Sequence, residues 1–331
     1  MNAVKALSRL KGFFLVTLCL GLWAGAVSAR DEPKAQARPK QPDIYNQKLD
    51  AREQLATACE RAKRDNSRVL VMLGGNWCGW CHKLHELFAS NQEIRKLLND
   101  EYLVLLVDLE APNAAEILKK CKESLSREEL EKGVGYPFLA VLDGDGNVLT
   151  AQRTDPLEEG DHHDPKKVKD FLERWVAEPV DAQSVLDAAL ARARSEEKRV
   201  FLHFGAPWCG WCHKLDDFLA RAEIAEILSR DYIDLKIDVD RMTRGKEVMA
   251  GYRPKDSGGI PWIAVLDAQG KVLASSDSAQ GNIGYPGQPN EIKHFIAMLK
   301  RTSRRIEPGQ LDRIEQTLRA AADQIKAQQG R

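Results

Sequence analysis

One segment of the sequence occurs twice, and this repeat constrains the fold more than any other feature. Residues 77–84, which read WCGWCHKL, recur unchanged as residues 208–215, 131 positions further along the chain. The similarity extends on both sides, since residues 68–69 match residues 199–200 and residues 136–143 resemble residues 260–267. A repeat of this kind indicates duplication of a structural unit. The chain of 331 residues is therefore expected to hold two copies of one domain.

Each copy shows the same expected order of elements: a helix, a buried strand, a cysteine pair that opens an amphipathic helix, a second buried strand, a helical segment, a hairpin and a closing helix. The strands are short apolar runs, typical of strands that are buried on both faces. Alternating helices and strands that end in a hairpin predict an α/β fold with a mixed central sheet flanked by helices. The expected strands are residues 69–73, 103–108, 200–204 and 233–238, the hairpin turns are residues 144–147 and 268–270, and the closing helices are residues 165–177 and 290–300.

The ends of the chain differ in composition from the repeated part. Basic residues, an apolar run over residues 12–26 and small residues at 27–29 predict a secretory signal peptide over residues 1–29. An uncleaved anchor is the alternative. Cleavage would leave no membrane span and would place the protein in the periplasm or outside the cell. The expected divisions are the signal peptide, a linker over residues 30–43, domains over residues 44–178 and 179–303, and an amphipathic helix over residues 304–331.

The cysteine pairs carry the chemistry that the sequence predicts. A strand that runs into C-x-x-C at the start of a helix places the first cysteine at the helix N-terminus, where unpaired N–H groups and the helix dipole favour a thiolate. Cys78 and Cys209 are therefore expected to attack a substrate disulfide, and Cys81 and Cys212, one helical turn later, to resolve the mixed disulfide.

Each copy resembles a thioredoxin-family domain, of the kind found in exported bacterial proteins with two tandem thioredoxin-like folds. The resemblance rests on Trp-Cys-Gly-Trp-Cys after a buried strand and on an X-Pro step 59 or 52 residues beyond the first cysteine. It implies that Pro137 and Pro261 are cis and face the cysteines. It also implies that the backbone of the preceding residues, Tyr136 and Ile260, pairs with an extended substrate.

Other residues near the cysteines are candidates for supporting roles. Trp77 and Trp208 are expected to form an apolar shelf beside the sulfur atoms, and Trp80 and Trp211 lie between the cysteines. His82 and His213 fall four residues after the attacking cysteines, hence on the same helix face. Each histidine either favours the thiolate or is a solvated surface residue.

The two copies depart from the family at one position. The family places an acidic residue six positions before the attacking cysteine, where this chain has Met72 in one copy and His203 in the other. Met72 cannot transfer protons. His203 is interpreted either as a buried base or as a core histidine, and the difference indicates that the two copies are not redundant.

Cys59 and Cys121 occur only in the first copy. Each lies on the expected inward stripe of its helix, and in the thioredoxin fold these two helices lie on the same side of the sheet. They are predicted either to form a structural disulfide or to remain separate buried thiols. The C-terminal helix is predicted to pack on a domain or to serve in oligomerisation.

Several rival interpretations remain. C-x-x-C-H matches c-type haem attachment, zinc ligation lacks a second set of ligands, and residues 161–164 (Asp-His-His-Asp) form a weak metal motif. We expect no metal at the cysteine pairs, and we expect neither flavin nor nicotinamide because no glycine-rich dinucleotide fingerprint is present. Equal numbers of basic and acidic residues, 49 of each, argue against nucleic acid as a partner.

The predicted function is thiol–disulfide exchange with protein substrates, in which a redox-recycling partner protein supplies or removes electrons. The alternative of a different class is a non-catalytic chaperone or adaptor. The direction of electron flow depends on reduction potentials, which the two residues between the cysteines do not fix.

Overall fold

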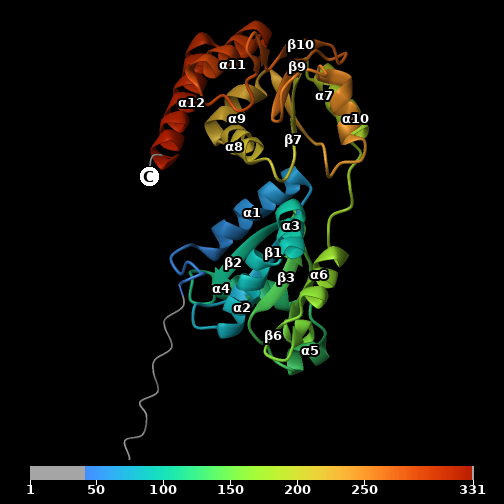
Figure 1. Cartoon of the computed structure of the whole chain (residues 1–331), viewed down its shortest axis with the longest axis vertical. Coiled ribbons are helices and arrows are strands. Elements are labelled where there is room, and N and C mark those ends of the chain that lie inside the picture. The colour runs from blue at the N-terminus through green and yellow to red at the C-terminus, as the bar shows by residue number, and fades with distance from the viewer. Residues whose placement is uncertain (1–41, 330–331) are drawn as a thin grey trace, which may run out of the picture. The chain divides into compact units, whose positions relative to one another are not determined.

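Two four-stranded sheets of identical topology form the framework. The computed structural model describes residues 42–329, and Figure 1 shows a first domain coloured blue to green and a second coloured green to red. The strand orders are β2-β1-β3-β4 and β8-β7-β9-β10. In each sheet the first two strands in sequence are parallel and the other pairings are antiparallel. The predicted α/β fold with a mixed central sheet in each copy is confirmed.

The bounds of the elements are close to those that the sequence predicts. In the first domain the strands are β1 (Arg68–Gly74), β2 (Tyr102–Asp108), β3 (Phe138–Leu142) and β4 (Val148–Arg153), with a small hairpin of β5 (Glu158–Glu159) and β6 (His162–His163). Its helices are α1 (Ala51–Asp65), α2 (Gly79–Ser90), α3 (Gln92–Glu101), α4 (Ala114–Lys122), α5 (Arg127–Glu131), a 3-10 turn (Asp155–Leu157) and α6 (Pro165–Arg174).

The second domain repeats this order. Its strands are β7 (Arg199–Gly205), β8 (Tyr232–Asp238), β9 (Trp262–Leu266) and β10 (Val272–Ser275), with a small hairpin of β11 (Asp277–Ser278) and β12 (Gly281–Asn282). Its helices are α7 (Ala182–Ser195), α8 (Gly210–Leu219), α9 (Ala222–Ser229), α10 (Gly245–Tyr252), α11 (Pro289–Thr302) and α12 (Pro308–Gln329).

Local signals in the sequence set where several helices begin. Asp50 and Asp181 precede α1 and α7, and their carboxylates accept hydrogen bonds from backbone N–H groups of the first helical turn. Asp164 does the same for α6, which opens with Pro165. These are preferred N-cap residues because they satisfy donors that the helix leaves unpaired, and proline is favoured at the first helical position.

Each sheet is covered on both faces, so each domain has two cores. In the first domain, alternate residues of β1 point to opposite faces, with Leu70 and Met72 packing against α2, α3 and α6, and Val69 and Val71 against α1 and α4. Burial on both faces explains why β1 reads as a continuous apolar run. β1 therefore lacks the polar alternation of a half-exposed strand, whereas β8 keeps it, with Asp234 exposed and Lys236 partly buried.

The C-terminal helix α12 packs on the second domain. Its residues Leu311, Ile314 and Leu318 are buried in the same core as Phe295 and Leu299 of α11. Figure 1 shows α12 running beside α11 at the red end of the chain. Of the two roles predicted for the C-terminal helix, packing on a domain and oligomerisation, the structure shows packing on a domain.

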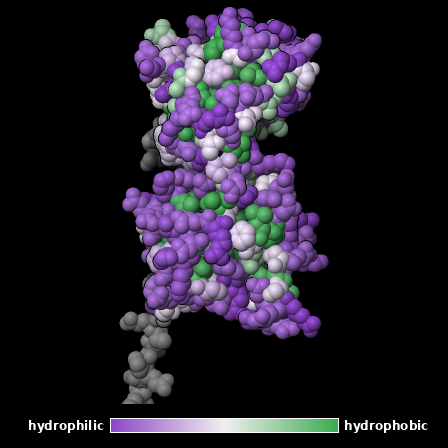
Figure 2. All heavy atoms as spheres, turned by 90° about the vertical axis from the view of Figure 1, so that its right-hand side faces the viewer, coloured by the Kyte–Doolittle hydropathy of each residue, from purple (hydrophilic) through white to green (hydrophobic). Residues whose placement is uncertain are grey.

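The surface is mostly polar, and the exposed aromatic residues lie near the cysteines. The face drawn in Figure 2 is largely hydrophilic, with apolar residues in small groups. Among the described residues, three of the seven large exposed apolar side chains are the tryptophans of the repeated motif, Trp77, Trp208 and Trp211. Each cysteine pair therefore has at least one exposed tryptophan from its own motif.

Within residues 42–329, no helix combines the length and the apolar character that crossing a bilayer requires. The predicted signal peptide (1–29) lies outside the described residues, as does the linker (30–43) except for its last two positions.

Candidate active sites

Each domain carries one cysteine pair at the start of a helix. Cys78 is the N-cap of α2 and Cys209 is the N-cap of α8. In both domains the sulfur of the first cysteine accepts a hydrogen bond from the backbone N–H of the second, at 3.1 Å. Cys78 is joined to Cys81 and Cys209 to Cys212 by disulfide bonds.

The two cysteines of each pair differ slightly in exposure. Cys78 and Cys209 are each 5% exposed, whereas Cys81 is fully buried and Cys212 is 2% exposed. The first cysteine of each pair is therefore slightly more accessible than the second. The N–H groups at the start of a helix and the positive end of the helix dipole form an environment that favours an anionic sulfur.

A cis-proline lies beside each pair. The peptide bonds Tyr136–Pro137 and Ile260–Pro261 are both cis. In the second domain the sulfur of Cys209 lies 3.6 Å from the carbonyl oxygen of Ile260. The backbone before the proline is thus within reach of anything bound at the attacking sulfur.

The tryptophans beside the cysteines are held by specific partners. Trp77 meets the ring of Tyr136 edge to face at 5.9 Å, while the indole N–H of Trp208 donates to Asp240 at 2.7 Å. Both rings stay more than half exposed. Each ring thus presents exposed apolar surface directly before the attacking cysteine in the sequence.

The tryptophans between the cysteines have different ring partners. Trp80 packs edge to face against His163 at 5.1 Å, and Trp211 stacks on Tyr285 at 5.8 Å. Burial, with Lys83 and His162 nearby, lowers the pKa of His163 to about 4, so its ring is neutral at pH 7. His163 of the Asp-His-His-Asp motif is therefore an apolar packing partner of Trp80.

His82 and His213 bind the loops that lead to the cysteines. Nε2 of His82 donates to the carbonyl of Asn76 at 3.0 Å, and Nε2 of His213 donates to the carbonyl of Pro207 at 2.6 Å. Each accepting residue lies two positions before the attacking cysteine. His82 is buried, so the interpretation as a solvated surface residue is wrong for it. The sequence spacing placed these histidines on the correct helix face but did not indicate their loop contact.

The two domains also differ six positions before the attacking cysteine. Met72 is fully buried in the core that contains Cys78 and Cys81. His203 is 3% exposed, with Nδ1 3.7 Å from Asp216 and Nε2 3.2 Å from Asp234. Asp216 also accepts a hydrogen bond from Lys236 at 2.7 Å. A buried polar cluster thus replaces the apolar Met72 in the second domain.

Tyr45 is a residue near the first site that the sequence did not single out. A Cβ added to Gly74 would overlap the sulfur of Cys81 and lie 2.7 Å from the hydroxyl oxygen of Tyr45. The tyrosine is held by Asn76, whose side chain accepts from the N–H groups of Ile44 and Tyr45. Burial and the neighbouring Asp108 raise the pKa of the Tyr45 hydroxyl, which keeps it protonated. No local pattern marks this contact, because Tyr45 precedes the first helix by six residues.

The matching glycine of the second domain has different neighbours. A Cβ added to Gly205 would lie 3.5 Å from the sulfur of Cys212 and 3.8 Å from Cε of Lys236. The resolving cysteine therefore lies beside a hydroxyl in the first domain and beside a lysine side chain in the second.

Cys59 and Cys121 are not joined to each other, and both are free and buried. A Cβ on Gly146 would lie 3.7 Å from the sulfur of Cys59, so this sulfur points toward the turn between β3 and β4. The structural disulfide is thus not formed, and the alternative of two separate thiols describes the first domain.

The two buried thiols are expected to resist alkylation. Burial raises the pKa of Cys121 to about 12 and also raises that of Cys59. A pKa of about 12 leaves on the order of 10⁻⁵ of the Cys121 thiol ionised at pH 7. In the folded, reduced protein, iodoacetamide should modify Cys78 and Cys209 much faster than Cys59 and Cys121, because the raised pKa values of Cys59 and Cys121 leave little thiolate to react. Mass spectrometry of the labelled peptides checks this, and fast labelling of Cys121 in the folded protein would contradict it.

Over residues 42–329, no three His, Cys, Asp or Glu side chains are grouped in a way that could hold a metal ion.

Comparisons with known proteins agree with this geometry. Residues 50–144 match the family model Thioredoxin_7, described as thioredoxin-like. Residues 162–323 match the model Thioredox_DsbH, described as a protein of unknown function, DUF255. The chain is a thioredoxin-family protein. Its tandem thioredoxin-like domains each contain one of the cysteine pairs.

Individual relatives match only part of this thioredoxin-family chain. Mouse spermatogenesis-associated protein 20 is 36% identical over 53 residues, which are 16% of this chain and 7% of the mouse protein. The disulfide bond reductase DsbH of Chlamydia pneumoniae is 25% identical over 105 residues, which are 31% of this chain and 63% of the chlamydial protein. The chain thus spans less than two thirds of either relative.

Among solved structures, a disulphide isomerase from Xylella fastidiosa Temecula1 matches 40% of this chain and 95% of its own, with 23% identity and a TM-score of 0.32.

Proposed function

We propose that this protein is an exported thiol–disulfide oxidoreductase that exchanges disulfides with other proteins through both cysteine pairs. The observation that carries the proposal is a twice-repeated arrangement: a nearly buried cysteine at a helix N-terminus, its partner one turn inside, and a cis-proline alongside. The similarity to the chlamydial disulfide bond reductase supports the same activity. Export is inferred from residues 1–29 of the sequence.

The reaction starts with a reduced pair. The thiolate of Cys78 or Cys209 attacks one sulfur of the substrate disulfide, forms a mixed disulfide and releases the other substrate sulfur as a thiolate, which takes up a proton. Cys81 or Cys212 then loses its proton and attacks the first cysteine of its pair. This second step forms the enzyme disulfide and releases the remaining substrate thiolate. The second substrate thiolate also takes up a proton, so the substrate gains two electrons and two protons. The enzyme pair loses two electrons, the proton of its second cysteine and the proton that its first cysteine gave up on ionising.

Reversal of the same steps oxidises a substrate dithiol, so a partner protein with a dithiol or disulfide returns the pair to its starting state. Reduction potentials relative to the compartment decide the direction. For the resolving step, we assign to the Tyr45 hydroxyl a hydrogen bond to the Cys81 thiolate. In the second domain we assign to His203, with Asp216 beside it, acceptance of the proton from Cys212.

The order of attack and resolution is tested by trapping. In a chain that keeps only the second pair, Cys212→Ser should accumulate a mixed disulfide between Cys209 and a disulfide-bonded protein, which lasts at least about 100 times longer than in the parent because no resolving thiol remains. Cys81→Ser should do the same in a chain that keeps only the first pair. Non-reducing electrophoresis and mass spectrometry of the linked peptides identify the bond.

Cys209→Ser in the same background is the matched control, since it removes the attacking sulfur and leaves Cys212. It should form no such adduct. A mixed disulfide to Cys212 in that variant would overturn the assigned order.

A further inference from the structure

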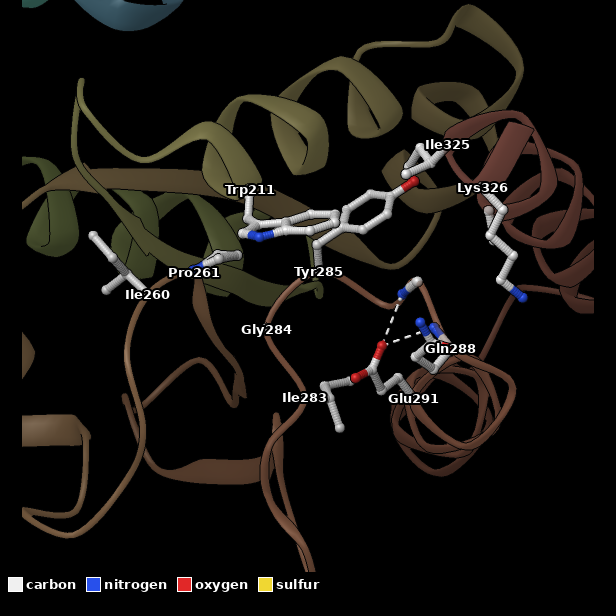
Figure 3. Close-up of a pocket in the computed structure, with 12 residues that line it drawn as sticks. Trp211, Ile260, Pro261, Ile283, Gly284, Tyr285, Gln288, Glu291, Ile325 and Lys326 are labelled. Carbon is white, nitrogen blue, oxygen red and sulfur yellow. Dashed lines mark hydrogen bonds between the residues drawn. The ribbon is translucent and has the colours of Figure 1, made fainter. Parts of the chain in front are cut away.

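A pocket of about 350 Å³ lies beside the second cysteine pair. Its lining comes from three parts of the second domain: the start of α8, the cis-proline loop with the segment after β12, and the two C-terminal helices. Figure 3 shows Trp211, Pro261, Tyr285 and Ile325 around it. The pocket is therefore built partly by α12, which follows the α11 helix that closes the repeated order of elements.

Part of the pocket wall is apolar, and Gln288, Glu291 and Lys326 make the rest of it polar. Trp211 is 46% exposed, and its ring stacks on Tyr285 with an interplanar angle of 23°. Ile283 and Ala322 belong to the core beneath, and Ile325 of α12 packs at its edge. In Figure 3, Ile325 lies next to the hydroxyl end of Tyr285. A side chain that entered this space would exchange contact with water for contact with aromatic rings and aliphatic carbons.

The one acidic side chain among the pocket-lining residues, Glu291, is already hydrogen-bonded to the backbone. The carboxylate of Glu291 accepts hydrogen bonds from the backbone N–H groups of Gly287 and Gln288, at 3.0 Å and 2.7 Å. It thereby caps α11, as the dashed lines in Figure 3 show. Because this charge serves the helix, the pocket is suited to an apolar group better than to a cation.

The pocket shares the cis-proline segment with the reacting sulfur. Ile260 and Pro261 line it, and the carbonyl oxygen of Ile260 is 3.6 Å from the sulfur of Cys209. A polypeptide whose cysteine bonds to Cys209 therefore has neighbouring residues within reach of the pocket. The occupant that fits is a segment of such a polypeptide.

The first domain has a different arrangement. The ring against Trp80 belongs to His163, and within the described residues α6 leads directly to α7 of the second domain. No counterpart of α12 follows α6 there. The first pair thus provides an internal control for any effect of α12.

We propose that this pocket, named here the α12 pocket, is a substrate subsite of the second domain that binds a large apolar side chain close in sequence to the reacting cysteine. The proposal rests on the proposed function, and it assigns to α12 a role in substrate selection. Burying a leucine or phenylalanine side chain is a favourable transfer from water, and it is available only to substrates that carry such a residue at the right place.

Two peptide probes test this subsite. Each is a single-cysteine peptide joined by a disulfide to thionitrobenzoate, and the two differ only in a leucine or serine next to the cysteine. The enzyme is the full chain with Cys78→Ser and Cys81→Ser, so that only the second pair reacts. We expect kcat/KM to be about 10 times higher for the leucine peptide.

Variants of α12 separate the pocket from general effects. Ile325→Asp places a charge in the apolar wall and should reduce the preference for leucine to about twofold or less. Gln324→Asp adds the same charge at the neighbouring exposed position of α12, which does not line the pocket, and should keep the preference. If circular dichroism shows that Ile325→Asp loses helix, Ile325→Asn in the same assay takes its place.

The reaction with a small symmetrical disulfide, 5,5′-dithiobis(2-nitrobenzoate), distinguishes the two proposals. If the parent chain fails to reduce it, the proposed function is wrong. If the parent reduces it but shows no preference for the leucine peptide, or if Ile325→Asp keeps the full preference, the subsite is wrong. A chain that keeps only the first pair should be indifferent to Ile325→Asp.

Discussion

Replacing Cys78 and Cys209 together with serine is expected to lower the rate of disulfide reduction by a factor on the order of 10³ or more. A serine hydroxyl remains protonated near neutral pH, so neither helix N-terminus would carry a nucleophile. Release of thiols from a disulfide-bonded protein, with a dithiol as electron donor, measures the rate. The single variants then give the share of each domain, because the intact pair continues to react.

The matched control changes the cysteines outside the pairs. Cys59→Ala and Cys121→Ala each remove a buried thiol that forms no disulfide. Each variant should keep most of the activity. A double serine variant that reduced disulfides at the parental rate would remove the oxidoreductase proposal and favour the chaperone or adaptor alternative.

Gly74→Ala is expected to destabilise the first domain by about 3 kcal/mol, whereas Gly205→Ala should cost the second about 1 kcal/mol or less. The added methyl group at Gly74 overlaps the Cys81 sulfur and lies 2.7 Å from the Tyr45 hydroxyl oxygen. Both neighbours are buried, and Asn76 holds Tyr45 in place. At Gly205 the nearest atoms are Cβ and the sulfur of Cys212, at 3.2 Å and 3.5 Å, which small shifts can accommodate.

Hydrogen–deuterium exchange read separately from peptides of β1 and β7 measures this difference, since a single unfolding curve would mix the two domains. Exchange of β1 should become faster in Gly74→Ala while β7 is unchanged. Equal protection of β1 in Gly74→Ala and in the parent would show that Tyr45 and Cys81 can move apart at little cost.

Much of the framework could be predicted because it depends on local patterns. The strand expected at residues 69–73 is β1 (Arg68–Gly74), and the closing helix expected at residues 165–177 is α6 (Pro165–Arg174). Strands buried on both faces appear as short apolar runs. Repetition of the motif placed both cysteine pairs at equivalent positions, each at the N-cap of a helix.

The remaining features depend on which segments meet in space. Tyr45 lies near Cys81 because Asn76 binds the chain before α1, and spacing along one helix cannot reveal such a contact. Helical spacing put His82 on the face of Cys78 but did not indicate that it binds the Asn76 carbonyl. Cys59 and Cys121 are both buried, as their positions on the helices predicted. The Cys59 sulfur, however, points toward the turn between β3 and β4, and no disulfide joins it to Cys121. The pocket required α12 to fold back along α11, which a helical period alone does not specify.

The contrasting surroundings of the two inner cysteines have a consequence for how such a chain can change over time. The hydroxyl near Cys81 comes from a segment ahead of α1, and the lysine near Cys212 comes from β8. Replacing Tyr45 changes the surroundings of Cys81, and replacing Lys236 changes those of Cys212. The reduction potentials of the two cysteine pairs in one polypeptide can therefore evolve independently of each other.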